Sequence, residues 1–134
     1  MKTFICALLI SASAFAAVTE LPKTLSKTMK AMSADLKQVA TQVADPKANE
    51  NSALLSDDFV AMVIHAKDFT PDTVAALPAN EQPAALAEYQ LMLDQTAEVG
   101  VKLAAAFRAN DNALATELLN QLSQAKKDGH TKFK

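Results

Sequence analysis

Glycine, cysteine and the larger aromatic residues are scarce in this chain. Its 134 residues include two glycines, one cysteine, one tyrosine and no tryptophan. So few glycines leave little material for the tight turns and bulges of an all-β fold. The single cysteine, Cys6, excludes an intrachain disulfide and any metal site built from several thiolates.

Strong charge of either sign is also absent. The chain has 13 basic and 15 acidic residues, for a net charge of −2. A weakly acidic surface argues against nucleic acid as a partner, because phosphate binding requires clustered basic residues. The sequence also contains no Ser/His/Asp set and no Glu-x-x-His motif, so we expect the protein not to be an enzyme.

The N-terminal segment has the pattern of a secretory signal peptide. Lys2 precedes an uncharged, mainly apolar run that contains a small-x-small cleavage signal at Ala14–Ala16. The run is shorter than the ~20 residues that span a bilayer. We therefore expect residues 1–16, with Cys6, to be removed, leaving residues 17–134 as one periplasmic domain without membrane insertion.

Beyond this segment, apolar residues recur at helical spacing. Two stretches follow steps of four and three residues, which is the seam of an amphipathic helix. The seam of the first stretch consists of Leu25, Met29, Met32, Leu36, Val39 and Val43. The seam of the second consists of Leu55, Phe59, Met62, Ala66 and Phe69.

Capping residues and prolines set the expected limits of these two helices. Thr19 is a candidate cap for the first, with Pro22 tolerated in its first turn and Asp45–Pro46 at its end. The second is expected to start at Asn51–Ser52 and to stop at Thr70–Pro71.

Two more helices follow a proline-rich connection, in which we expect one short helical turn at Asp72–Ala76. The third helix should run over residues 83–109 and the fourth over residues 112–132, with a tight turn at Asn110–Asn112. Four amphipathic helices joined mainly by short links predict an all-α fold, an antiparallel up-down-up-down four-helix bundle.

This topology brings the start of the first helix beside the end of the last. Met29 lies near that start and His130 lies near that end. A thioether opposed to a neutral imidazole is one of the axial ligand pairs of haem iron. On the third helix, Leu86, Tyr89 and Leu93 form an i, i+3, i+7 stripe that suits the face of a porphyrin.

The segments MKAMSADLK (residues 29–37) and NQLSQAKKDGHTKFK (residues 120–134) resemble the two ends of the soluble periplasmic cytochrome b562 family. The resemblance also covers the signal peptide, the length and the four-helix pattern. It implies one non-covalent b-type haem per chain, with Met29 and His130 as the iron ligands. It further implies electron transfer with an unidentified periplasmic redox partner, and we expect a monomer.

Three positions depart from that family's pattern. Leu86, Tyr89 and Leu93 fall where the wall of the haem pocket is expected, but Leu93 stands where an aromatic residue is familiar. Gly129 replaces a bulkier residue before the histidine and loosens the helix by about 1 kcal/mol relative to alanine. Lys126 replaces an arginine, which keeps the positive charge but loses the planar guanidinium group that can bind a carboxylate through two N–H donors.

Other interpretations stay open. Met32 takes the place of Met29 as iron ligand if the register shifts by one turn. The alternative function is a haem-free periplasmic bundle that binds a partner or an apolar small molecule at its open end. Copper binding is disfavoured because the methionines lie on three helices without a Met-rich tract. We expect His65 at the surface or a boundary, and Met62 and Met92 in the core or at a boundary.

Overall fold

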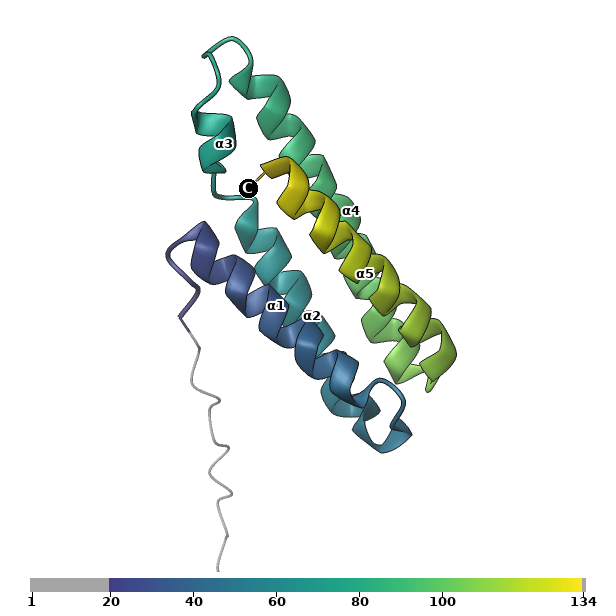
Figure 1. The fold of residues 1–134 in the computed structure, drawn as a ribbon. Helices are drawn as coiled ribbons and strands as arrows, with labels where there is room; N and C mark the ends of the chain where they lie inside the picture. Colours follow the sequence, from purple (N-terminus) through teal and green to yellow (C-terminus); the bar gives the residue numbers. More distant parts are fainter. Residues whose placement is uncertain (1–19, 134) are drawn as a thin grey trace, which may run out of the picture.

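The computed structural model describes residues 20–133, which are helical and contain no strand (Figure 1). The prediction of an all-helical chain is confirmed for them. The expected signal peptide, residues 1–16, and Thr19 lie outside the described residues. The elements are α1 (Leu25–Gln42), the 3-10 helix η1 (Pro46–Ala48), α2 (Asn49–Ala66), α3 (Asp72–Ala75), α4 (Gln82–Arg108) and α5 (Asn112–Phe133). Across residues 20–133, no helix combines the length and apolar character that crossing a membrane requires.

Helix α1 begins later than expected, because Thr24 caps it. The Thr24 side-chain oxygen accepts a hydrogen bond from the backbone N–H of Lys27 at 3.2 Å. Thr24 directly precedes the apolar seam, so it serves better than a cap several residues upstream. The expectation that Pro22 lies in the first turn was therefore wrong. Instead, the Pro22 carbonyl oxygen lies 2.7 Å from Nε2 of the half-buried His65, which ties the segment before α1 to α2.

Both ends of α2 also differ from the expected limits. It starts at Asn49, ahead of Asn51–Ser52, because the 3-10 helix η1 leads directly into it. It ends at Ala66 rather than at Thr70–Pro71. The residues after Ala66 form shorter i→i+3 turns, and the Ala66 carbonyl accepts a hydrogen bond from the Tyr89 hydroxyl at 2.7 Å.

The long helices pack in a chain of neighbours, α1 against α2, α2 against α4, and α4 against α5. Helix α4 lies close to α2 at Gly100, where an added Cβ would lie 2.7 Å from Cγ2 of Val60. The α1/α2 pair lies beside the α4/α5 pair in Figure 1, and the backbones of α1 and α5 do not pack closely against each other. The large side chains buried most deeply are Phe59, Phe107, Leu103, Leu122, Val39 and Val63.

An amide network joins the elements at the end of the molecule that contains η1 and the α4–α5 turn. The buried Asn49 side chain donates to Oδ1 of Asn110 and to Oδ1 of Asn112, both at 3.0 Å. Asn112 donates back to Asn49 Oδ1 and to the Val43 carbonyl, both at 2.8 Å. Asn110 adopts a left-handed backbone with φ 55°, which asparagine tolerates better than most residues. This network fixes α1, α2 and α5 at one end, which we call the closed end.

Candidate functional site

The opposite end of the molecule contains a cavity of about 500 Å³, which we call the outer cavity. It is bounded by the start of α1, the segment around α3, the first half of α4 and the end of α5. Pro71, Asp72 and Thr73 line it from the α3 side. Its volume lies within the ~300–1,000 Å³ typical of ligand and cofactor pockets. We call this end of the molecule the open end.

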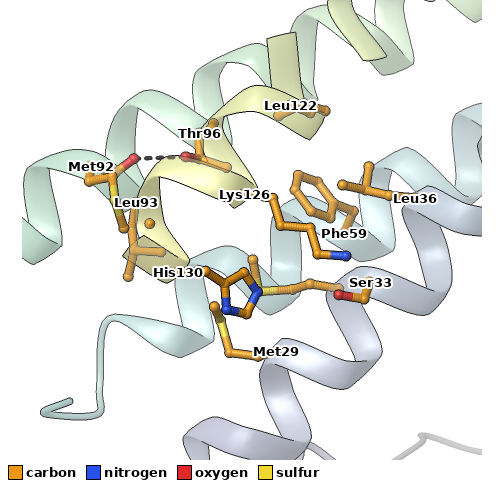
Figure 2. Close-up of a pocket in the computed structure, with 13 residues that line it drawn as sticks. Met29, Ser33, Leu36, Phe59, Met92, Leu93, Thr96, Leu122, Lys126 and His130 are labelled. Atoms are coloured by element: carbon orange, nitrogen blue, oxygen red, sulfur yellow. Dashed lines mark hydrogen bonds between the residues drawn. The ribbon is translucent and has the colours of Figure 1, made fainter. Parts of the chain in front are cut away.

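A second, smaller cavity of about 40 Å³ lies deeper between the helices and is shown in Figure 2. We call it the inner cavity. Its walls include Leu36, Phe59 and Leu122 from the core, so it reaches toward the middle of the molecule. A volume of this size exceeds the ~10–15 Å³ that one water molecule requires. It suits a small ion or a few waters, whereas the outer cavity suits a much larger ligand.

Met29 and His130 line both cavities. They lie on α1 and α5, the two helices whose backbones are separated, and both side chains are half-buried. Figure 2 shows the thioether of Met29 and the imidazole ring of His130 projecting toward each other. The structure thus brings together two potential metal ligands from opposite ends of the sequence. Met32, one turn further along α1, lines only the inner cavity.

The three residues expected on the pocket wall have different positions. Tyr89 and Leu93 are buried and line the outer cavity. Leu86 is partly buried against the core and lines neither cavity. Burial raises the pKa of Tyr89 to about 12, so its hydroxyl stays neutral and donates to the Ala66 carbonyl. Tyr89 therefore presents its ring, not a charge, to the cavity.

The last turn of α5, which presents His130, is anchored by contacts with α3 and α4. The Thr73 hydroxyl donates to the Phe133 carbonyl at 3.1 Å. The Phe133 ring meets the Tyr89 ring edge-on, with centroids 5.3 Å apart. Lys132 forms an ion pair with Glu88 on α4. These contacts counter the loosening expected from the glycine that precedes the histidine.

Gly129 itself is buried and lies against the Met92 side chain. A Cβ at this position would lie 3.2 Å from Cε and 3.3 Å from Sδ of Met92 on α4. The glycine therefore lets α5 approach the Met92 side chain, which also lines both cavities. A side chain at this position would therefore require the end of Met92 to shift by a few tenths of an ångström.

Basic side chains lie at the cavities. Lys30 lines the outer cavity and Lys126 lines the inner one. Asp72 is the one carboxylate among the described residues that line the outer cavity, and no carboxylate is found among those that line the inner cavity. The lysines can pair with carboxylate groups of a ligand whose apolar part lies between α1 and α5.

Sequence reasoning missed Met92, Thr73 and Phe133 as parts of this site. Phe133 follows His130 by three residues, so helical spacing places both on one face of α5. Thr73 lies in the expected short helical turn, but its contact with α5 depends on the path of the whole connection. No match was found among protein-family models, curated proteins or solved structures. The interpretation of the site therefore rests on its own residues and geometry.

Proposed function

We propose that this protein is a periplasmic electron-transfer protein of the cytochrome b562 type. In this proposal α1, α2, α4 and α5 form a four-helix bundle that binds one non-covalent b-type haem, with Met29 and His130 as axial ligands. The observation that carries it is the shared cavity. Met29 and His130 are 101 positions apart (130 − 29) and line the same 500 Å³ space between α1 and α5.

The residues present fit a haem in three respects. The donor pair is one that haem iron accepts. The wall of the outer cavity offers aromatic and aliphatic side chains for a flat apolar ring, including Tyr89, Leu93 and Phe133. Lys30 supplies a positive charge for carboxylate groups at the edge of that ring. Met29 is a better candidate than Met32 because Met32 does not line the outer cavity.

The expected activity follows from the two axial positions. When bound, the haem supplies a one-electron iron couple, and a thioether ligand raises its potential relative to two imidazoles. As iron ligands, Met29 and His130 would leave no open position for oxygen or a substrate. The contacts of the last turn of α5 with Thr73 and Tyr89 would hold His130 in place. These features support outer-sphere electron transfer rather than catalysis on a substrate.

An absorption spectrum of the protein expressed in a bacterial periplasm, oxidised and then reduced with dithionite, tests this proposal. Sharp α and β bands of a low-spin b-type haem, removable with acid-acetone, are the expected result. A colourless protein that also fails to take up added hemin would overturn the proposal.

Single variants test the ligands. His130→Ala should largely abolish haem retention, whereas His65→Gln should retain haem because His65 contacts Pro22 away from both cavities. Met29→Leu should give a mixed or high-spin spectrum and a lower potential. Met62→Leu is its matched control, since Met62 is buried in the core and lines neither cavity. A low-spin spectrum unchanged by Met29→Leu would move the ligand to Met32.

A second candidate is a haem-free bundle that binds an apolar small molecule at the open end. The outer cavity supports it, because apolar atoms contribute most of its wall surface and its volume suits such a ligand. A colourless protein that co-purifies with an extractable apolar compound would favour this function. Uptake of one equivalent of hemin, with the spectral changes above, would exclude it as the leading account.

A further inference from the structure

Methionine gathers around His130 in a way that the sequence did not suggest. The described chain has four methionines, and three of them line the inner cavity together with the imidazole of His130. Met62 is the exception. They come from three helices, so their spacing along the chain hides the convergence. We call this group the Met/His cluster, and it consists of Met29, Met32, Met92 and His130.

We propose that the Met/His cluster is a binding site for one monovalent copper ion, Cu(I), in the haem-free protein. Thioether sulfur is a soft ligand that selects Cu(I) over harder cations, and imidazole is also a suitable copper ligand. Three thioethers and one imidazole give enough donors for a single ion. This inference does not rest on haem binding, although the two ligands would share Met29 and His130.

The size and charge of the inner cavity support this choice of ion. Its volume of about 40 Å³ suits an ion and not a large organic cofactor. None of the described side chains that line it is a carboxylate, so it lacks the charged oxygen ligands typical of Mg²⁺ and Ca²⁺ sites. Nor does any group of three or more His, Asp or Glu side chains within residues 20–133 form a site for a metal ion. The neutral donors of the cluster fit a soft cation of low charge.

The surrounding residues help to hold the donors in place. The backbone carbonyl of Met92 accepts a hydrogen bond from Thr96 Oγ1 at 2.8 Å, as Figure 2 shows. The Met92 side chain lies against Gly129, next to His130. Met32 is almost fully buried, with 9% of its surface exposed. Flexible thioethers can adjust around an ion without disturbing the helices that bear them.

The positive charge of Lys126 would repel a cation in the inner cavity. Lys126 is the only lysine or arginine among the described residues that line the inner cavity. Its side chain is exposed, so its ammonium group can turn toward water. A monovalent ion experiences half the repulsion that a divalent ion would experience. Lys126→Gln should therefore strengthen Cu(I) binding, a change opposite in sign to the loss of any ligand.

The experiment is an anaerobic titration of the haem-free protein with Cu(I), in competition with a chromogenic Cu(I) chelator. We expect one Cu(I) per chain. Met32→Leu and Met92→Leu should each weaken binding by at least about tenfold, since even residues outside the ligand set change metal affinity that much. Met62→Leu should bind as the unmodified protein does. Thermal unfolding of each variant establishes that it is folded.

Labelled methionine methyl groups provide a second readout by NMR. The methyl signals of the three cluster methionines should shift on adding one equivalent of Cu(I), and that of Met62 should stay unchanged. Failure to take Cu(I) from the chelator, or equal weakening by Met62→Leu, would overturn the inference. Haem-loaded protein should bind Cu(I) at least about tenfold more weakly than haem-free protein, because the ligands are shared.

The two proposals fail separately. Hemin uptake without Cu(I) binding overturns the copper site alone. Cu(I) binding by a protein that does not take up hemin overturns the haem proposal alone.

Discussion

The closed and the open end of this molecule are held together by different chemistry. At the closed end, asparagine side chains of fixed geometry satisfy one another around Asn49. At the open end, thioether side chains and the imidazole of His130 line the two cavities. Amide networks lock one arrangement because an unpaired buried group is costly. Thioethers adapt to what lies beside them. One end of the molecule can therefore secure the fold while the other remains available for a ligand.

Removing the central amide of the closed end should have the largest effect on stability. Asn49→Ala removes the buried amide that hydrogen-bonds to the exposed Asn110 and the half-buried Asn112, and it leaves a gap at the buried position of Asn49. We expect the free energy of unfolding to fall by about 2–3 kcal/mol, measured by urea denaturation. The control is Asn51→Ala, because Asn51 is exposed and makes one long hydrogen bond of 3.4 Å. Similar losses in both variants would contradict a locking role for the network.

The middle of the molecule should tolerate little change. In Gly100→Ala the new methyl group would lie 2.7 Å from Val60 Cγ2 and 3.2 Å from Phe59 Cδ1. Relief requires the Val60 and Phe59 side chains to shift or α4 to move away from α2, and Phe59 has little room because only 2% of it is exposed. We expect a loss of about 1–3 kcal/mol in the free energy of unfolding, despite the better helix propensity of alanine. A Gly100→Ala protein as stable as the parent would show that the α2–α4 contact has room for an added methyl group.

Asp35, midway along α1, should make stability depend on pH. Oδ2 of Asp35 is buried without a hydrogen-bond partner among residues 20–133. Burial, with a contribution from the neighbouring Asp58 carboxyl, raises the pKa of Asp35 to about 7 from an ordinary 3.8. At pH values between 3.8 and about 7, Asp35 keeps its proton in the folded protein, whereas the unfolded chain has released it. The free energy of unfolding should therefore fall as the pH rises through this window.

Replacing Asp35 by asparagine removes this contribution. At pH 8, Asp35→Asn should be more stable than the parent by about 1 kcal/mol, less than the full shift implies because Asp35 is partly exposed to solvent. The difference should shrink toward pH 4. Urea denaturation at pH 4.5, 6 and 8 measures it, with the exposed Asp128→Asn as control. A stability difference between Asp35→Asn and the parent that stays constant from pH 4.5 to pH 8 would show that titration of Asp35 is not its cause.

Local patterns were enough to predict the helical segments, but not all of their ends. The seam from Leu25 to Val43 and the turn at Asn110–Asn112 are sequence-local signals, and the structure contains both. The end of α2 was not predictable in this way, since the Ala66 carbonyl is satisfied by Tyr89 from a distant helix. The candidate site likewise depends on contacts between helices that are distant in sequence.

Met29 and His130 were singled out by topology, and the structure places them at one cavity. Met92 was overlooked because helical spacing on α4 alone does not reveal which residue of α5 it meets. That partner is Gly129, and the contact between Met92 and Gly129 appears only in three dimensions. Contacts between elements far apart in sequence were thus the part that sequence reasoning could not supply.

The smallest effect should come from Gly129→Ala, the open-end counterpart of Gly100→Ala. Its new methyl group would meet the flexible end of Met92 at 3.2–3.3 Å, not the ring of a buried phenylalanine. Met92 borders the cavities and can move by a few tenths of an ångström. Alanine also favours the helix by about 1 kcal/mol over glycine, so we expect a net gain of roughly 0.5 kcal/mol in the free energy of unfolding. A loss as large as that of Gly100→Ala would mean that the open end is packed as rigidly as the middle of the molecule, and that the adaptability assigned to its thioethers is wrong.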